Sequence, residues 1–289
     1  MKPKVEDFKQ FNVLSWAHTL LEINSREKGV AEMLLQHHLE MDRTTFYMHM
    51  REEVSSDVWI SFKRDIEHHI ATGIPVQHLI GYEYFYGRKF SVNEHVLVPR
   101  METEELVLHV LEQMGQESSP DLSIVDVGTG SGIIATTLAL ELPKATLLAT
   151  DISKDALKTA KQNAANHEAA VTFYEGNFLQ PLIDIGEEVD IVVSNPPYIS
   201  WQDEPNLSDT VKNFDPTLAL FADEDGLAAY KMILEQIENH LQEVKQIYFE
   251  IGYNQRQSII RLAKQIFPDC EIKCLQDINE KDRIIAISL

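Results

Sequence analysis

The chain has 289 residues, 44% of them hydrophobic, which is enough for one large domain and a smaller second one. Its net charge is −21; residues 1–100 (12 Lys and Arg against 14 Asp and Glu) contribute −2, and residues 101–289 (13 against 32) contribute −19. A part so acidic argues against a general DNA-binding protein, because affinity for DNA depends on neutralising phosphates. We therefore expect no direct nucleic-acid binding.

The sequence has no long apolar run and no charged-then-apolar N-terminus, so we expect neither a transmembrane helix nor a secretory signal. The two cysteines, Cys270 and Cys274, form a single Cys-x3-Cys pair, which is typical of ordinary reduced thiols. We predict a cytoplasmic protein with no metal centre and no membrane partner, and we take a monomer as the expected state.

The first part of the chain, residues 1–82, has the pattern of a helical bundle. Apolar residues recur there at helical spacing, as in Leu14, Ala17, Leu20 and Leu21. This spacing predicts a small helical N-terminal domain.

Residues 83–100 are predicted to be a β-hairpin that links two domains. Two apolar runs, residues 90–92 and 96–98, flank a polar stretch of three residues, which is the pattern of two strands joined by a short turn. The second domain is expected over residues 101–289. It would open with a helix, for which Thr103 is the candidate N-cap.

A glycine loop follows the first strand of this second domain. Residues 122–127 have the pattern of a buried strand, Gly128-Thr129-Gly130-Ser131-Gly132 forms the loop, and a helix is expected from Ile133. Glycines let the backbone approach a ligand closely, and a helix N-terminus presents free N–H groups to it. The spacing differs from the dinucleotide fingerprint G-x-G-x-x-G. Candidate cofactor-binding residues here are Asp126, Gly128, Thr129, Gly130 and Gly132.

Two further polar residues follow the next two predicted strands. Asp151 ends a strand over residues 145–150, where a carboxylate is well placed to bind two ribose hydroxyls. Asp151 could instead cap the helix that begins at Ser153, but beside a glycine loop we favour the ribose role. Asn177 follows a strand over residues 171–174 and could either contact the edge of an adenine or serve a turn.

The most specific stretch is Ser194-Asn195-Pro196-Pro197-Tyr198-Ile199, which follows an apolar strand. Two prolines fix two φ angles and supply carbonyls without N–H groups. The side-chain oxygen of Asn195 and the backbone oxygen of Pro196 can accept both N–H donors of a planar –NH2 group. Acceptors that hold both hydrogens turn the nitrogen lone pair toward an electrophile. The alternative is a proline turn capped by Asn195, since Asn-Pro is a common turn dipeptide.

Strands and helices continue to alternate to the end of the chain. This alternation predicts an α/β fold with a doubly wound, mostly parallel sheet, in which ligands bind at the carboxyl ends of the strands. Such ends hold Asp126, Gly128, Asp151, Asn177 and Asn195. Their common placement is the strongest argument from the residues alone that they form one site.

The chain resembles the class I S-adenosylmethionine-dependent methyltransferases, which have a Rossmann-like fold. Residues 126–132 resemble their cofactor loop, and residues 195–198 resemble the signature for methylation of a planar nitrogen, which adenine-N6 DNA methyltransferases and protein glutamine-N5 methyltransferases share. Further stretches over residues 75–289 resemble the HemK-type release-factor glutamine methyltransferases: Pro75 to Gly81, Phe85-Tyr86-Gly87, Val96 to Arg100, Glu102-Thr103-Glu104, Phe214-Asp215-Pro216, Asp225-Gly226-Leu227, Glu250-Ile251-Gly252 and Asp282-Arg283. Met101 departs from the pattern, because the family usually has proline there.

This resemblance implies S-adenosyl-L-methionine as cofactor, S-adenosyl-L-homocysteine as product, and class 1 peptide-chain release factors as partners. The N-terminal bundle would hold the release factor. Asn195 and Pro196 would grip the amide of the glutamine in its Gly-Gly-Gln motif, and Tyr198 would wall the amide and the methyl group. Asn195, Pro196 and Tyr198 are thus the expected catalytic residues, Pro197 joins them in binding substrate, and Asn195 also borders the cofactor.

Several alternatives stay open at this point. The acceptor motif alone also permits adenine-N6 methylation of a nucleic acid, but the charge and the lack of a basic stretch disfavour it. A glutamine of a ribosomal protein is a closer alternative substrate. A non-catalytic cofactor-binding module would be expected to have lost the acceptor motif, and the glycine spacing disfavours a nicotinamide-dependent dehydrogenase.

Overall fold

A computed structural model describes residues 7–115 and 122–289 of the chain, which form two compact units. The first unit runs up to Gly81 and also includes Ser208–Phe214; the second comprises Tyr82–Leu207 and Asp215–Leu289. We expected the N-terminal domain to consist of residues 1–82 alone. The later segment joins it through contacts that no local sequence pattern marks.

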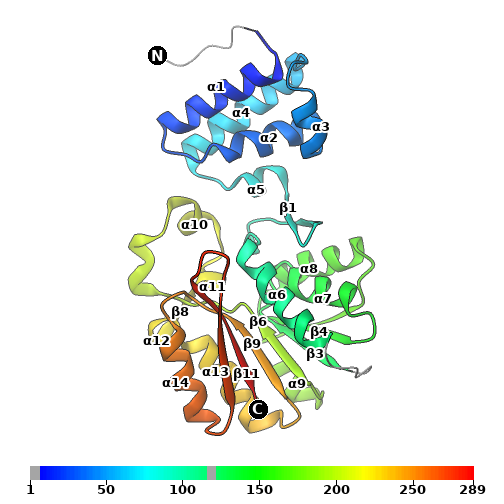
Figure 1. Ribbon diagram of the computed structural model, residues 1–289, viewed down its shortest axis with the longest axis vertical. Coiled ribbons are helices and arrows are strands. Elements are labelled where there is room, and N and C mark those ends of the chain that lie inside the picture. The colour runs from blue at the N-terminus through cyan, green and yellow to red at the C-terminus, as the bar shows by residue number, and fades with distance from the viewer. Residues whose placement is uncertain (1–6, 116–121) are drawn as a thin grey trace. The chain divides into compact units, whose positions relative to one another are not determined.

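The first unit is helical throughout its described part (Figure 1). Its helices are α1 (Gln10–Ile23), α2 (Gly29–Leu39), α3 (Arg43–Met48), α4 (Ser56–Thr72), α5 (Val76–Ile80) and α10 (Asp209–Phe214). Side-chain oxygens of Asp42 and Ser55 cap α3 and α4 at their N-termini, and Gly73, with a φ of 76°, ends α4. The guanidinium of Arg26 donates to both carboxylate oxygens of Asp209, each at 2.7 Å, and so holds α10 in this unit.

The second unit is built on a seven-stranded sheet with the order β10-β11-β9-β6-β3-β4-β5. The strands are β3 (Ser123–Val127), β4 (Thr146–Asp151), β5 (Val171–Glu175), β6 (Ile191–Ser194), β9 (Gln246–Glu250), β10 (Glu271–Gln276) and β11 (Asp282–Ser288). The neighbouring strands β9, β6, β3, β4 and β5 pair in parallel. Strand β11 pairs antiparallel with both β9 and β10. This confirms the predicted α/β fold with a doubly wound, mostly parallel sheet.

The order of the chain across the sheet reverses between β3 and β6. The chain runs outward from β3 through β4 to β5, then crosses back and places β6 on the other side of β3. The hydroxyl of Ser194 at the end of β6 donates to the carbonyl of Val127 at the end of β3, at 2.6 Å. The two strands therefore end side by side, at the position where ligands bind in open α/β sheets.

Helices cover both faces of this sheet (Figure 1). One face packs against α6 (Met101–Met114) and α7 (Ile133–Glu141), and its core includes Leu106 and Leu138. The other packs against α13 (Ala228–His240) and α14 (Arg256–Ile266), with Tyr230 and Ile259 fully buried. The shorter or flanking elements are α8 (Lys154–Asn166), α9 (Gln180–Ile185), β7 (Ile199–Ser200), η1 (Trp201–Asn206), α11 (Thr217–Leu220), β8 (Phe221–Ala222) and α12 (Asp223–Gly226). No helix in the described ranges is long and apolar enough to cross a membrane.

A hairpin is present in the region of residues 83–100, but the predicted pairing of residues 90–92 with 96–98 is wrong, because residues 96–98 form no strand. The two strands are β1 (Tyr82–Phe85) and β2 (Arg88–Ser91), joined by a two-residue turn at Tyr86 and Gly87. Both turn residues have positive φ, 51° and 72°, as the turn type that matches strand twist requires. This register puts the rings of Phe85 and Phe90 on one face, where both are buried in the core of the second unit.

Candidate functional site

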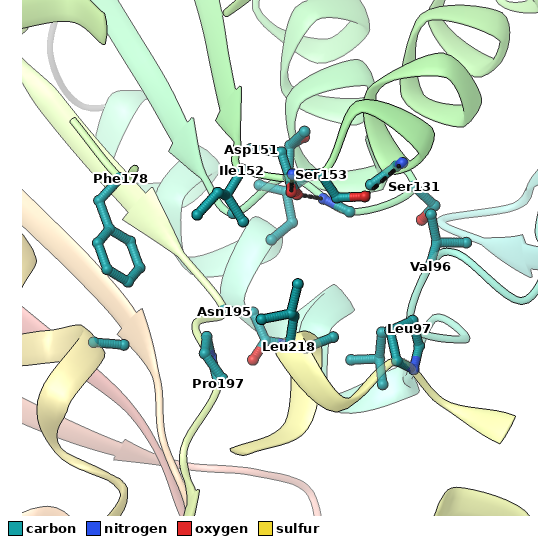
Figure 2. A pocket seen from close by; sticks show the side chains of 18 of the residues that line it. Val96, Leu97, Ser131, Asp151, Ile152, Ser153, Phe178, Asn195, Pro197 and Leu218 are labelled. Atoms are coloured by element: carbon teal, nitrogen blue, oxygen red, sulfur yellow. Dashed lines mark hydrogen bonds between the residues drawn. The ribbon is translucent and has the colours of Figure 1, made fainter. Parts of the chain in front are cut away.

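A cavity of about 350 Å³ lies at the carboxyl ends of the parallel strands. Its size is within the range of pockets that hold small molecules and cofactors. Its walls come from several places in the second unit: the stretch after the hairpin, the start of α6, the glycine loop with the start of α7, the ends of β4, β5 and β6, and the segment over residues 216–232. In Figure 2, Asp151, Ile152 and Ser153 lie on one side of this space, with Asn195 and Pro197 across from them.

The glycine loop after β3 has the conformation that its sequence predicts. Gly128, Gly130 and Gly132 all have positive φ, between 55° and 80°, and all but Gly132 line the cavity. Gly132 instead sits against α8, where an added Cβ would lie 2.9 Å from the Cβ of Ala160 and 3.0 Å from its Cα. Thr129, although buried, also lines the cavity. Glycine is thus needed here for two reasons, backbone conformation and close packing.

Asp126 lies beneath the loop and is not among the residues that line the cavity. One of its carboxylate oxygens accepts hydrogen bonds from the hydroxyl of Thr129, at 2.6 Å, and from the N–H of Ala135, at 3.1 Å. The other oxygen has no partner among the residues that the structure describes. Burial raises the pKa of Asp126 to about 7. Its side chain therefore shapes the loop from below.

Asp151 joins the end of β4 to the glycine loop. One carboxylate oxygen accepts from the N–H of Gly130 and the other from the N–H of Ser153, both at 2.8 Å. Its alternative role as a helix cap is wrong, because the N-cap of α8 is Ser153, whose hydroxyl oxygen accepts from the N–H of Ala156 at 3.2 Å. Burial raises the pKa of Asp151, and its side chain lines the cavity.

Asn177 lies in the cavity wall after β5, as expected from its place at a strand end. The neighbouring residue, Phe178, also lines the cavity, and so does Ile152 beside Asp151 (Figure 2). No sequence pattern predicted these two apolar residues. Their position directly after two candidate ligand-binding residues was the available signal, since pockets for flat ring systems are mostly apolar.

The acceptor turn after β6 (residues 195–198) is only partly exposed to the cavity. Asn195 and Pro197 line it, whereas Pro196 and Tyr198 do not. The ring of Tyr198 packs at the edge of the core formed with α13 and α14, and burial raises its pKa to about 12. The phenol therefore stays neutral at physiological pH.

The backbone of the acceptor turn is held from behind. The side-chain amide of Gln255 donates to the carbonyl of Tyr198 at 2.9 Å. Gly226 packs against the same carbonyl so closely that an added Cβ would lie 2.1 Å from the oxygen. These contacts position the turn without using any atom that faces the cavity.

Thr103 has a different role from the predicted one. It is not the N-cap of α6, which is Arg100; it lies within the helix, is buried, and lines the cavity. Its hydroxyl oxygen accepts from the side-chain amide of Asn195 at 3.2 Å. Several other lining residues were not predicted, because they are apolar and no expected chemistry singled them out: Val96, Leu97, Leu218, Phe221 and Met232.

The arrangement brings together the groups that a transfer reaction between two bound molecules requires. The glycine loop and the carboxylate of Asp151 border one part of the cavity, and the Asn195 side chain stands at its wall. No described donor meets the Asn195 side-chain oxygen, so it is available to a bound –NH2 group.

The chain matches known protein families and known relatives. Residues 12–81 match the PrmC N-terminal domain, and residues 103–213 match the methyltransferase small domain. The release factor glutamine methyltransferase of Bacillus cereus is 43% identical to this chain, over 95% of the chain and 97% of that protein. The protein of the same name from Bacillus subtilis is 44% identical, over 96% of each.

Among solved structures, the N-terminal domain of human METTL16 in complex with SAH has a TM-score of 0.50. It shares 15% sequence identity, and the match covers 83% of this chain and 85% of that one. At this identity the likeness concerns the fold alone.

Gly132→Ala should lower the free energy of unfolding more than Gly128→Ala does. Both changes impose a positive φ on alanine, at a cost of about 1–2 kcal/mol, but only Gly132 has backbone atoms of a neighbouring helix within contact of the new methyl group. Urea denaturation of both variants measures the difference. Equal losses would mean that α8 does not pack against the loop as described.

Asp126→Asn should flatten the dependence of stability on pH. The pKa of Asp126 is about 7 in the folded protein and about 4 in the unfolded chain. Between these two pH values the unfolded chain therefore binds fewer protons than the folded protein. The free energy of unfolding therefore falls as pH rises from about 4 to 7, and Asn removes this contribution.

Denaturation at several pH values tests this. Asp155→Asn is the control: a hydrogen bond from Lys158 lowers the pKa of that exposed carboxylate, which is thus ionised in the folded and the unfolded chain over this pH range, so its removal should leave the slope unchanged. An unchanged slope in Asp126→Asn would show that Asp126 is ionised in the folded protein.

Proposed function

Because this chain belongs to the family of release factor glutamine methyltransferases, we propose that it methylates the glutamine of the Gly-Gly-Gln motif in class 1 peptide-chain release factors. The methyl group would come from S-adenosyl-L-methionine and would be transferred to the side-chain amide nitrogen, N5. The observation that carries this proposal is the position of Asn195 in the wall of a cavity whose opposite side is the glycine loop and Asp151.

The residues around the cavity suit S-adenosyl-L-methionine. Gly128 and Gly130 have positive φ, and an added Cβ at either position would meet nothing within 4 Å. A ligand can therefore approach the backbone of the loop closely. Asp151 would accept from ribose hydroxyls, Asn177 would contact the adenine edge, and Ile152 and Phe178 would cover its faces. When bound, the cofactor supplies an electrophilic methyl group on a sulfonium, and S-adenosyl-L-homocysteine is the product.

Asn195 and Pro196 would hold the substrate amide. An amide nitrogen is a poor nucleophile because its lone pair is delocalised over the carbonyl. The Asn195 side-chain oxygen and the Pro196 carbonyl would accept its two N–H bonds and so aim the lone pair at the methyl carbon. Pro197, which lines the cavity, would limit the movement of the amide, and Tyr198 would wall the acceptor side. The extra proton would leave after the new C–N bond forms.

The helical N-terminal unit would hold the release factor, and the acidic second unit would bind the cofactor. The net charge of −19 over residues 101–289 supports a protein substrate over DNA or RNA, because a nucleic acid would be repelled. A glutamine of a ribosomal protein is the remaining alternative substrate. We place the reaction in the cytoplasm, where release factors act, and expect a monomeric enzyme without a metal ion.

The direct test offers purified release factor, ribosomal protein and duplex DNA, in parallel, to the enzyme with labelled S-adenosyl-L-methionine. Peptide mass spectrometry should place the label on the glutamine of the Gly-Gly-Gln motif. Label on DNA alone would keep the cofactor and the Asn195 chemistry but would refute the proposed substrate. Label on a ribosomal protein alone would point to the related glutamine substrate.

Asn195→Ala should lower kcat by roughly tenfold to a hundredfold, because one N–H of the substrate amide loses its acceptor. Cofactor affinity, measured by calorimetry, should stay nearly unchanged. Asp151→Ala is the matched contrast and should weaken cofactor binding instead. An Asn195→Ala enzyme with the wild-type rate would rule out the proposed mechanism.

A further inference from the structure

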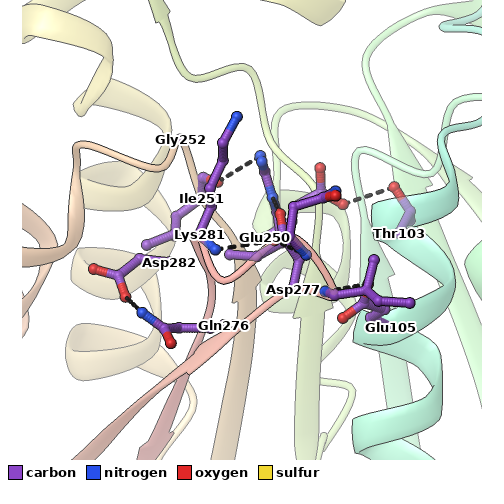
Figure 3. A network of polar contacts seen from close by, with 12 residues as sticks. Thr103, Glu105, Glu250, Ile251, Gly252, Gln276, Asp277, Lys281 and Asp282 are labelled. Atoms are coloured by element: carbon purple, nitrogen blue, oxygen red, sulfur yellow. Dashed lines mark hydrogen bonds and ion pairs between the residues drawn. The ribbon is translucent and has the colours of Figure 1, made fainter.

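Asn195 belongs to a chain of hydrogen bonds that ends on a buried carboxylate. The side-chain amide of Asn195 donates to the hydroxyl oxygen of Thr103 at 3.2 Å. The Thr103 hydroxyl in turn donates to a carboxylate oxygen of Glu250 at 2.6 Å, a contact shown in Figure 3. Glu250 is the last residue of β9, only 2% exposed, and does not line the cavity. The three residues come from different elements of the second unit, separated by 92 and 147 positions.

The chemistry of these groups decides which of them donates and which accepts in each hydrogen bond. An ionised carboxylate can only accept, so the single hydrogen of the Thr103 hydroxyl must go to Glu250. The Thr103 oxygen then can only accept, and the group of Asn195 that meets it must be the –NH2. The Asn195 oxygen is thereby left for the cavity. We propose that Thr103 and Glu250 are positioning residues that hold the oxygen of Asn195, and not its –NH2, toward the substrate amide.

This proposal rests on the proposed function, because it presumes that Asn195 accepts from the substrate. Without these hydrogen bonds, the amide of Asn195 could turn by half a rotation, because its oxygen and its –NH2 differ little in shape. The turned amide would present its –NH2 to the –NH2 of the substrate. Two N–H groups facing each other repel, so the turned amide could not hold the substrate. The carboxylate would thus act on the reaction through two intervening hydrogen bonds.

Several charged or titratable groups face Glu250. Arg283 on β11 lowers its pKa, Arg100 does so more weakly, and Glu102 at the start of α6 raises it. Tyr198 is also within electrostatic reach, and the hydroxyl of Tyr230 donates to the Glu250 backbone carbonyl at 2.8 Å. The hydrogen bonds of Arg283 go to other partners, a carboxylate oxygen of Asp277 and the carbonyl of Ile251, each at 3.2 Å.

Burial outweighs these neighbours and raises the pKa of Glu250 to about 7. A protonated Glu250 can donate to Thr103, whose hydroxyl can then donate toward Asn195. Each hydrogen bond in the series from Glu250 to Asn195 would then have its donor and acceptor exchanged, and this would favour the turned amide. Turnover should therefore fall as pH drops through about 7, for a reason that lies outside the cavity.

The first test compares substitutions at Thr103 with labelled cofactor and purified release factor. Thr103→Val keeps the shape but removes the hydroxyl, and should lower kcat by about tenfold with unchanged calorimetric affinity for S-adenosyl-L-homocysteine. Thr103→Ser restores the hydroxyl and should recover most of kcat. Thr137→Val is the matched control: Thr137 is also buried in a helix, and its hydroxyl has no partner within the described ranges. It should behave as wild type.

The second test is the pH profile of kcat, which the wild-type enzyme provides without any substitution. We expect an acidic limb near pH 7 that Glu250→Gln abolishes, together with a lower rate at high pH, because a glutamine amide can donate as well as accept. Thr103→Val should also flatten this limb, since it disconnects Glu250 from Asn195. If a variant fails to fold, the wild-type profile and Thr103→Ser still decide the matter.

The outcomes separate this inference from the proposed function. Loss of activity in Asn195→Ala together with wild-type kcat in Thr103→Val would overturn the positioning role and leave the function intact. A Thr103→Ser enzyme as slow as Thr103→Val, or a wild-type profile without an acidic limb, would also overturn it. If Asn195→Ala itself is fully active, the proposed function fails first. Adding Thr103→Val to Asn195→Ala should cause no further loss.

Discussion

The parallel pairing of β3 with β6 is the constraint on which the site depends. It places two loops from distant parts of the sequence, the glycine loop after residue 127 and the acceptor turn after residue 194, at one edge of the sheet. The hydrogen bond from Ser194 to Val127, buried between the strand ends, ties the two loops together at their bases. A cofactor in one loop and an amide in the other would therefore meet without any large movement of the backbone.

Around this pair of strands, buried polar side chains mainly support the loops that border the cavity. Asp126 shapes the glycine loop, and Gln255 supports the acceptor turn. Asn163 on α8 donates to the carbonyls of Ser91 and Ser131 and so joins the hairpin to the loop. Each such group satisfies hydrogen-bonding capacity that burial would otherwise leave unmet. The same bonds fix the positions of the loops around the cavity, and fixed positions are what catalysis by orientation requires.

The fold and most of the site could be predicted because they follow from local patterns. Alternating strands and helices imply a parallel sheet, and such a sheet gathers strand ends at one edge. This reasoning found Gly128, Asp151, Asn177 and Asn195, all of which line the cavity. It failed where two signals were ambiguous. Thr103 has the residue type of an N-cap but lies inside its helix, and Val96 and Leu97 resembled part of a strand but line the cavity instead.

The sequence by itself determined the class of fold, the order of its elements and the loops that border the cavity, because motifs and periodicity act over a few residues. Only the tertiary structure decided which of these residues face the cavity and which support it. Asp126 lies under the loop, Tyr198 packs toward the core, and Glu250 reaches Asn195 only through Thr103. The physical reason is that side-chain contacts across a sheet depend on how the helices pack over it, and no spacing along the chain records that packing.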